Sequence, residues 1–421
     1  MPVATDLRQV HSRFSAVLQR QPCAAGPIGL AVSGGGDSIA MMHLAARALP
    51  ADQLRVVTVN HGLRADAADE IAEVSRQAAL LSVHHTVLNW TWDGTGNLQA
   101  AARAGRWASI ADWTIGHQIN TVFLGHTEDD QVETLLMRLA RGSGIDGLTA
   151  MARADYRDGL RVVRPLLDIS RGVLRDWLTA EKIKWCDDPS NDDPRFDRVR
   201  ARQMFAKLEE LGLTRKRLLQ TIDHMQAAHK SLQIAAQDFA RTTVRQDAGD
   251  LIFHADALDL DSMDAPRRVM AAGFLWVSGN MYRPRFDRLL EIVEQVRKGQ
   301  TSTLGGCLLS PMRGGGLRMT REPAATKIYT VPERQNDATG AIWDRRWFVE
   351  GALDQGMTVR ALGDGIRHCP DWREVDIPRT SLLASPSVWS GETLISAPVA
   401  GFPCGFTARI VADFHEHAFA H

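Results

Sequence analysis

Hydrophobic and polar positions in the first third of the chain follow two alternating patterns. Short apolar runs rich in β-branched residues predict buried strands, and longer alanine-rich runs predict helices. The expected strands are residues 28–32, 54–59, 83–88 and 121–124. The expected helices are residues 39–48, 66–81, 98–115 and 129–139. Repeated strand–helix units of this length predict an α/β fold in which helices cover both faces of a parallel sheet.

The pattern changes after Pro165. Helices are expected at residues 171–182, 215–243 and 284–298, a polar loop at 185–202, and β-hairpins at 299–322. A stretch rich in proline and polar residues at 322–339 is a candidate linker. A chain of 421 residues is expected to form two or three domains. We therefore predict an α/β domain at residues 1–214, a mainly helical domain at 215–325 and a small α+β domain at 326–421.

The composition mainly excludes some classes of protein and some kinds of site. No apolar run approaches the roughly 20 residues that span a bilayer, and the N-terminal segment lacks the apolar core of a signal peptide. The five cysteines include no Cys-x-x-Cys pair, which argues against a disulfide framework, a zinc knuckle or an iron–sulfur site. We therefore expect a cytoplasmic protein with no membrane partner. The net charge of -1 gives no overall attraction to nucleic acid, so any RNA contact must come from local basic patches.

The first candidate site is a glycine-rich segment between the first expected strand and its helix, and we call residues 33–38 the glycine loop. Its members are Ser33, Gly34, Gly35, Gly36, Asp37 and Ser38. Three glycines permit a tight turn that brings backbone N–H groups close to a phosphate, and the helix N-terminus adds to the attraction. A carboxylate beside phosphates is suited to bind magnesium, so we expect Asp37 to be a metal ligand. The alternative is an ordinary turn in which Asp37 or Ser38 caps the helix.

The glycine loop resembles the SGGxDS signature of the PP-loop, or N-type, ATP pyrophosphatases. Members of that superfamily cleave ATP between its α- and β-phosphates and transfer AMP to a carbonyl oxygen. The activated carbon is then attacked by a nitrogen or sulfur nucleophile. The resemblance implies that residues 33–38 bind ATP with Mg2+ and that Asp37 is catalytic. It leaves the substrate open.

Three further segments resemble the tRNA(Ile)-lysidine synthetase family of this superfamily. They are HGLR at residues 61–64, GHTEDDQVET at 125–134, and an arginine-rich segment at 191–202. The match extends over about residues 28–205, and residues 359–364 resemble a C-terminal segment of the family. The resemblance implies that ATP adenylates C2 of the wobble cytidine in the CAU anticodon of tRNA(Ile). The amine of L-lysine then attacks this carbon, which gives lysidine, AMP and pyrophosphate and changes decoding from AUG to AUA.

The GHTEDDQVET segment supplies two acidic residues with helical spacing. Asp130 and Glu133 are three residues apart, so they lie near one face of the expected helix. Two carboxylates beside a nucleotide site could hold one ammonium group of free lysine and leave its other amine to react. The resemblance implies this role for both acids, and it places His126 near the reacting phosphate as a catalytic residue. The alternative is that Glu128, Asp129 and Asp130 only complement the helix dipole.

Arg103 and His61 complete the expected site. Arg103 and Arg106 lie on one expected helix, in a segment that resembles a family pattern with tyrosine in place of Trp107. We expect Arg103 to be catalytic and to contact lysine or phosphate, and a solvent-exposed arginine pair is the alternative. His61 follows the second expected strand, where side chains face the nucleotide, and we expect it to bind ATP. A hydrogen-bonded structural histidine is equally consistent with its position.

Arginines are concentrated in two segments that could bind RNA. Residues 134–175 contain eight arginines and four acids, and the segment after Asn191 contains Arg195, Arg198, Arg200 and Arg202. Arginine makes bidentate phosphate contacts and stacks on exposed bases. We expect the second group to bind tRNA, together with the helical domain, and a homodimer is compatible with the sequence. An exposed arginine-rich surface without a ligand is the alternative.

Three other functions fit parts of the same pattern. A tRNA thiolase of the superfamily would share the glycine loop, but enzymes of that kind generally depend on cysteine chemistry, and this chain has no cysteine pair near the loop. A small-molecule amidating synthetase would not need the second and third domains. A non-catalytic RNA-binding relative predicts erosion of the loop, whereas Ser33, Asp37 and Ser38 are all present.

Overall fold

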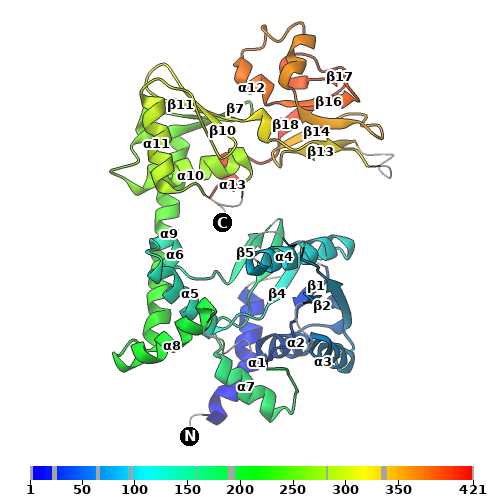
Figure 1. Cartoon of the computed structure of the whole chain (residues 1–421), viewed down its shortest axis with the longest axis vertical. Coiled ribbons are helices and arrows are strands. Elements are labelled where there is room, and N and C mark those ends of the chain that lie inside the picture. Colours follow the sequence, from blue (N-terminus) through cyan, green and yellow to red (C-terminus); the bar gives the residue numbers. More distant parts are fainter. Residues whose placement is uncertain are drawn as a thin grey trace. The chain divides into compact units, whose positions relative to one another are not determined.

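The computed structural model describes residues 3–20, 26–62, 67–92, 94, 98–157, 159–187, 195–280, 283–332 and 339–419. The chain forms two compact units, Met1–His229 and Lys230–His421 (Figure 1). Helix α9, Arg215–Thr243, begins in the first unit and ends in the second. Within the described ranges, every helix is too short or too polar to cross a membrane. The three domains expected from the sequence stay a prediction.

The first unit is built on a six-stranded sheet with the order β3-β2-β1-β4-β6-β5. Its strands are β1 (Ile28–Ala31), β2 (Leu54–Asn60), β3 (His84–Asn89), β4 (Thr121–Leu124), β5 (Ala154–Arg157) and β6 (Leu160–Val163). Neighbouring strands are parallel except β5 and β6, which form an antiparallel hairpin at one edge. The four expected strands and the mostly parallel sheet are therefore confirmed.

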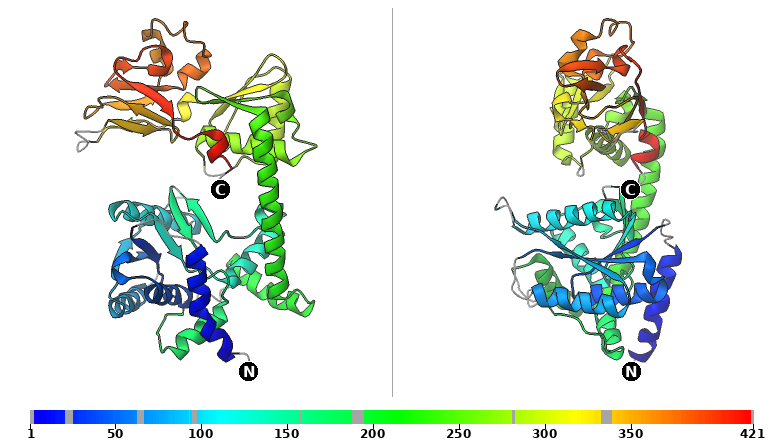
Figure 2. Two further views of the ribbon diagram at one scale, coloured as in Figure 1. Left: turned by 180° about the vertical axis from the view of Figure 1, so that it is seen from behind. Right: turned by 90° about the vertical axis from the view of Figure 1, so that its right-hand side faces the viewer.

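Helices cover both faces of this sheet. They are α1 (Val3–Arg20), α2 (Gly36–Ala48), α3 (Ala67–Leu80), α4 (Leu98–Gly116), α5 (Glu128–Ala140), α6 (Ile145–Leu148), α7 (Arg171–Ala180) and α8 (Asp197–Glu210). Consecutive residues of β2 mark the two faces, because Val56 packs with α1, α2, α3 and α7 whereas Val57 packs with α4. Figure 2 shows α4 on one side of the sheet and α2 and α3 on the other. Both faces are thus buried, as a mostly parallel sheet requires.

The end of the predicted polar loop at 185–202 is wrong. Helix α8 begins at Asp197 and buries Val199, Ala201 and Phe205. Its apolar positions are few and are separated by charged residues, so the helical period is weak in the sequence. Residues 188–194 of the same loop lie outside the described residues. Helices α1 and α10 (Asp264–Ser278) also carry no prediction from the sequence.

The described residues of the second unit form three antiparallel sheets. Their orders are β7-β8-β11-β10-β9, β12-β15-β16-β17 and β13-β14-β18. The strands are β7 (Val244–Asp247), β8 (Asp250–Phe253), β9 (Ser302–Leu304), β10 (Cys307–Pro311), β11 (Leu317–Arg321), β12 (Tyr329–Thr330), β13 (Gly340–Trp343), β14 (Trp347–Glu350), β15 (Thr358–Ala361), β16 (Pro386–Ser390), β17 (Thr393–Ser396) and β18 (Thr407–Ile410). Helices α10 and α11 (Phe286–Arg297) pack on the five-stranded sheet, and α13 (Phe414–His417) adds Phe414 to that core. The helical region and the β-rich C-terminal region expected from the sequence are therefore present.

Candidate active site

The glycine loop connects β1 to α2 at the carboxyl ends of the parallel strands. Gly34 has a backbone φ of +92°, a left-handed conformation that glycine adopts without strain. The Ser38 hydroxyl donates to the carbonyl of Gly35 at 2.9 Å and accepts the backbone N–H of Ser33 at 3.2 Å. Gly35 is the N-cap of α2, and no side chain in the described structure caps this helix. The alternative of a turn capped by Asp37 or Ser38 is therefore wrong, and the N-terminus of α2 is suited to bind an anion.

Asp37 uses one of its two carboxylate oxygens within the protein. Its Oδ2 accepts a hydrogen bond from Nε of Arg171 at 2.9 Å. Its Oδ1 is buried and has no hydrogen-bond partner among the described residues. Burial raises the pKa of Asp37 above its usual value, while the charge of Arg171 opposes this shift. A buried carboxylate oxygen without a donor is costly to the protein alone and is available to a bound cation.

The GHTEDDQVET segment approaches the glycine loop closely through Gly125. A Cβ atom at Gly125 would lie 3.0 Å from Cα of Ser38 and 3.2 Å from the carbonyl carbon of Asp37, so any larger residue would force the two segments apart. Thr127 is the N-cap of α5, and its backbone N–H donates to Oδ2 of Asp130 at 2.9 Å in a capping box. Asp130 thus stabilises the N-terminus of α5, which is the structural role predicted from the sequence as the alternative for this residue.

Asp130 and Glu133 form a buried pair, which we call the acid pair, and arginines contact both members. Their side chains are only 6% and 4% exposed. Arg198 donates to Asp130 Oδ1 at 3.0 Å, and Arg202 lies 3.0 Å from Glu133 Oε1. Glu133 Oε2 is buried and has no hydrogen-bond partner in the described part of the chain. Burial raises the pKa of Glu133, whereas at Asp130 the effect of burial is outweighed by Arg198 and His126, and the pKa is lowered.

Two of the four arginines expected to bind tRNA therefore contact the acid pair. Arg198 and Arg202 lie on α8, and the packing of α8 against α5 brings both guanidinium groups to these carboxylates. Arg200 instead pairs with Asp197 at the surface of the helix, and Arg195 lies just before it. From the sequence, the lysine pocket and the tRNA contact are predicted as separate sites. The fold brings residues of both predicted sites into contact, and the ligands of these sites stay predictions.

His126 and His61 are partly buried imidazoles with lowered pKa values. Burial lowers the pKa of His126 to about 4, and its Nδ1 has no hydrogen-bond partner among the described residues. Burial also lowers the pKa of His61, whose ring meets that of Trp90 edge-on with centroids 5.6 Å apart. The charge of Arg106 adds to both shifts, which places Arg106 near the two imidazoles. Arg103 lies exposed on the same helix, α4, and its contact with lysine or phosphate stays a prediction.

Arg171 is the main site residue that the sequence analysis did not single out, because it is grouped there with the other arginines of residues 134–175. It is the first residue of α7, after the N-cap Ser170. One signal was present in the sequence. A cation at a helix N-terminus opposes the helix dipole, so an arginine in this position indicates acidic partners from elsewhere in the fold.

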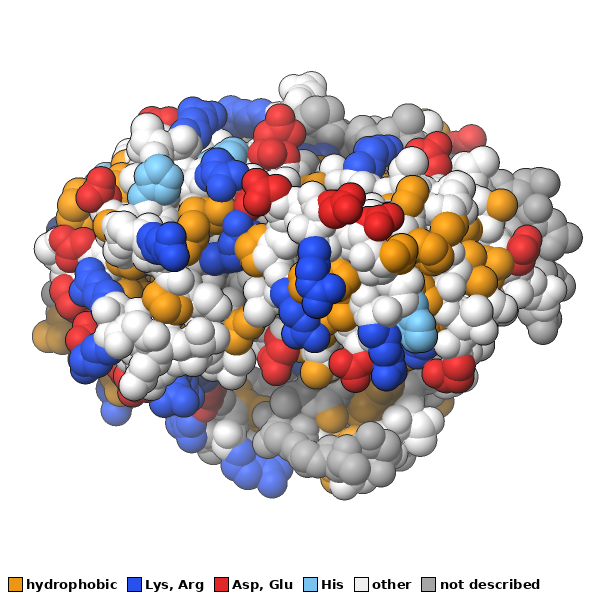
Figure 3. All heavy atoms as spheres, turned by 90° about the horizontal axis from the view of Figure 1, so that it is seen from above, with side chains coloured by type: hydrophobic (Ala, Val, Ile, Leu, Met, Phe, Trp, Pro, Cys, Tyr) orange, Lys and Arg blue, Asp and Glu red, His pale blue; other side chains and the backbone are white. Residues whose placement is uncertain are grey.

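Other arginines of residues 134–175 also contact the protein itself. Arg138 donates to two backbone carbonyls, Arg164 pairs with Asp155, and Arg157 lies over the ring of Trp107. Elsewhere on the molecule, the face seen from above in Figure 3 also shows acidic and basic side chains interspersed. A local excess of arginine in this sequence therefore does not by itself indicate a free RNA-binding surface.

Known proteins are similar to this chain both in the PP-loop domain and over nearly its full length. The family model of the PP-loop domain matches residues 7–209. The tRNA(Ile)-lysidine synthase of Ruegeria pomeroyi is 42% identical over 99% of this chain and 99% of its own length. That of Rhodopseudomonas palustris is 44% identical over 54% of this chain and 67% of its own length. Among solved structures, the U34-tRNA thiolase NcsA from Methanococcus maripaludis matches 52% of this chain and 80% of its own, at 15% identity and a TM-score of 0.45.

The similarity to the first of these relatives extends over the whole chain and includes both the glycine loop and the C-terminal sheets. Family membership therefore does not depend on the PP-loop domain alone. The chain belongs to the tRNA(Ile)-lysidine synthase family.

Proposed function

We propose that this chain forms lysidine in tRNA(Ile). In the proposed reaction, O2 of the wobble cytidine of the CAU anticodon attacks the α-phosphate of ATP, and pyrophosphate leaves. The amine of L-lysine then attacks C2 of the adenylated base, and AMP leaves. The product decodes AUA in place of AUG. The observation that carries the proposal is the link from the glycine loop to the acid pair through Arg171, in a chain of this family.

The glycine loop and α2 have the features that a bound triphosphate requires. The uncapped N-terminus of α2 offers backbone N–H groups and a partial positive charge. The Ser33 hydroxyl, 3.3 Å from that of Ser38, adds a donor beside it. The guanidinium of Arg171, beside Asp37, would stabilise charge that develops on the phosphate during adenylation. These groups support ATP binding at residues 33–38.

Magnesium is the cation that best fits the unpaired oxygen of Asp37. Mg2+ in nucleotide sites is held through one or two carboxylates together with substrate phosphates, so a cage of several protein ligands is not needed. Among the described residues no cluster of three or more His, Cys, Asp or Glu could hold a metal ion. Asp37 Oδ1, buried and without a donor, matches the one-carboxylate arrangement. Bound there, magnesium would neutralise phosphate charge.

The acid pair is suited to hold lysine by one of its ammonium groups. Glu133 Oε2 has no hydrogen-bond partner among the described residues, so it is the proposed contact. The attacking amine must be uncharged. Burial, the main cause of the lowered pKa of His126, favours the neutral form of an amine in the same way. One end of lysine would thus be held as a cation and the other kept nucleophilic.

Transfer RNA would reach this site through cationic side chains of α8. Arg198 and Arg202 are 40% and 39% exposed, so each can be reached from solvent while it contacts the acid pair. Arg195 and Arg200 would extend this surface toward phosphates. A location in the cytoplasm and a homodimer are proposed on the sequence alone.

A thiolase of the same superfamily is the competing reaction. Cys186 is the described cysteine next to the glycine loop, because its backbone N–H donates to the carbonyl of Gly34 at 3.0 Å. The four described cysteines are all unpaired, and burial raises the pKa of the Cys186 thiol, which disfavours the reactive thiolate. The described residues therefore offer no activated cysteine pair for sulfur transfer.

The deciding experiment measures labelled lysine incorporated into tRNA with ATP, and compares Glu133→Gln with Glu210→Gln, an exposed acid at the end of α8. We expect incorporation to require both ATP and tRNA(Ile). Glu133→Gln should raise the lysine KM about tenfold to a hundredfold, since a hydrogen bond to a charged group contributes roughly 1.5–3 kcal/mol. Glu210→Gln should match the parent protein. Turnover with sulfide or ammonia in place of lysine would contradict the proposed function.

A further inference from the structure

One guanidinium group joins the nucleotide loop to the acid pair. Arg171 Nε lies 2.9 Å from Asp37 Oδ2, Nη2 lies 3.6 Å from Asp130 Oδ2, and Nη1 lies 3.5 Å from Glu133 Oε1. Its backbone N–H donates to Asp129 Oδ2 at 2.7 Å, so the main chain is held as well. Each nitrogen of the side chain therefore faces a different carboxylate.

The position of Arg171 in α7 makes this arrangement specific. A cation at the first residue of a helix is unfavourable in isolation. Burial lowers the pKa of the guanidinium, but Asp37, Asp130 and Glu133 together outweigh it, and the pKa is raised above its usual value. The side chain is 21% exposed, so its contacts are mostly sheltered from solvent. The fold thus holds a permanent positive charge between three acids.

Arg171 faces one oxygen of Asp37 and one oxygen of Glu133, and the other oxygen of each carboxylate has no partner among the described residues. At Asp37 it takes Oδ2, and Oδ1 remains buried without a hydrogen-bond partner in the described structure. At Glu133 it faces Oε1, and Oε2 is the unpartnered oxygen there. The two unpaired oxygens are those assigned above to magnesium and to lysine. A single group therefore orients both carboxylates.

We propose that Arg171 is a positioning residue that aligns Asp37 with the acid pair and so supports both half-reactions, an inference that rests on the proposed function. Adenylation depends on the Asp37 contact, and lysine transfer depends on the Asp130 and Glu133 contacts. Only the planar three-nitrogen fork of arginine can make all three contacts at once, because a lysine ammonium is a single point charge. Arg202 approaches the acid pair at Glu133, where its Nη2 lies 3.0 Å from Oε1.

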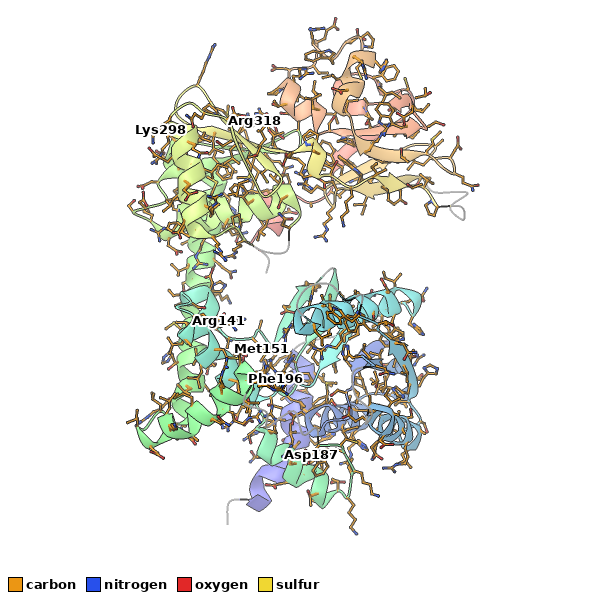
Figure 4. The ribbon with its side chains drawn as sticks, in the orientation of Figure 1. Arg141, Met151, Asp187, Phe196, Lys298 and Arg318 are labelled. Carbon is orange, nitrogen blue, oxygen red and sulfur yellow. The ribbon has the colours of Figure 1, made fainter. Side chains whose placement is uncertain are left out.

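The test measures the two half-reactions separately. Adenylation is followed by ATP–pyrophosphate exchange with tRNA(Ile) and no lysine, and transfer by lysine incorporation with both substrates. The variants are Arg171→Lys, Arg171→Gln and Arg202→Gln. Arg175→Gln is the matched control, because Arg175 lies one turn along α7 and pairs at the surface with Asp187, labelled in Figure 4. Thermal unfolding is recorded for every variant.

Arg171→Lys and Arg171→Gln should lower kcat of both half-reactions about tenfold to a hundredfold, the usual cost of losing a residue that orients a metal or substrate ligand. Arg202→Gln should raise the lysine KM, because it removes a cation that contacts Glu133. Arg175→Gln should alter neither. If Arg171→Gln fails to fold, Arg171→Lys decides the matter.

Loss of only one half-reaction in Arg171→Lys, or losses no larger than in Arg175→Gln, would overturn the positioning role. So would a loss that simply follows a fall in unfolding temperature. Failure of the unaltered protein to incorporate lysine would instead contradict the proposed function, so the two failures are distinguishable.

Discussion

Two buried charge clusters, one in each compact unit, are made of similar groups but differ in what they leave unpaired. The site cluster, in the first unit, consists of Asp37, Asp130, Glu133 and Arg171. The sheet cluster, in the second unit, consists of Asp250, Arg318, Thr320 and Ser381. Each cluster places an arginine against buried carboxylate, and each is assembled from segments far apart in the chain.

The sheet cluster is saturated at the oxygen where its donors meet. Asp250 Oδ2 accepts from Arg318 at 2.8 Å, from Thr320 at 3.0 Å and from Ser381 at 2.5 Å, and Arg318 is labelled in Figure 4. These contacts connect β8, β11 and α12 (Arg379–Leu383). In the site cluster, by contrast, Asp37 Oδ1 and Glu133 Oε2 are buried without partners among the described residues.

The difference separates a structural network from a binding site. A saturated buried network has already recovered the cost of removing its charges from water, so its contribution is to stability. An unsaturated one carries an unrecovered cost, which a cationic ligand would remove. Both clusters bury charged groups. They differ because the site cluster has two buried acceptor oxygens without partners among the described residues.

Asp37→Asn should show the largest effect on activity. It removes the charge at the unpaired oxygen, and we expect ATP–pyrophosphate exchange to fall about a hundredfold or more, as when a group that stabilises transition-state charge is lost. The fold should not suffer, because burial disfavours this charge and Arg171 keeps its contacts with the acid pair. Thermal unfolding should therefore change by no more than about 2 °C. A large fall in unfolding temperature would show that Asp37 has a structural role like that of Asp250 in the sheet cluster.

Asp250→Ala should show the opposite result. Removal of one partner from a buried pair leaves the other uncompensated, so we expect the free energy of unfolding to fall by about 3 kcal/mol in chemical denaturation. Asp238→Ala is the control, because Asp238 is 65% exposed and pairs with Arg241 at the surface, and it should cost no more than about 0.5 kcal/mol. Equal effects of the two substitutions would remove the structural role of the sheet cluster.

His126 gives the smallest of the three effects, and it depends on pH. The pKa of His126 is about 4 in the folded chain and 6.5 for the ordinary group, so the unfolded chain takes up the proton first as pH falls. Its contribution to stability is therefore present above pH 6.5 and is lost as pH falls toward 4. His126→Gln should flatten the free energy of unfolding over this range, by on the order of 1 kcal/mol at pH 5. An unchanged slope would show that His126 is freely protonated in the fold.

Much of the fold of the first unit could be predicted from local pattern. The runs at residues 54–59 and 98–115 are long and regular, so strand and helix were assigned correctly and their ends shifted by one residue. Helix α8 is not predicted from the sequence, because a segment in which arginine and acid dominate shows little apolar period. Its helical state depends on tertiary packing of Val199 and Phe205.

The sequence alone identified the glycine loop, the spacing of Asp130 and Glu133 and, through resemblance, the family. These features are local, and they depend on backbone freedom at glycine and on helical periodicity. It could not show that Arg171 would meet Asp37 across 134 positions of chain, or that Arg198 and Arg202 would contact the acid pair. Which oxygens stay unpaired is decided only when separate helices pack, because hydrogen bonding is a property of positions in space.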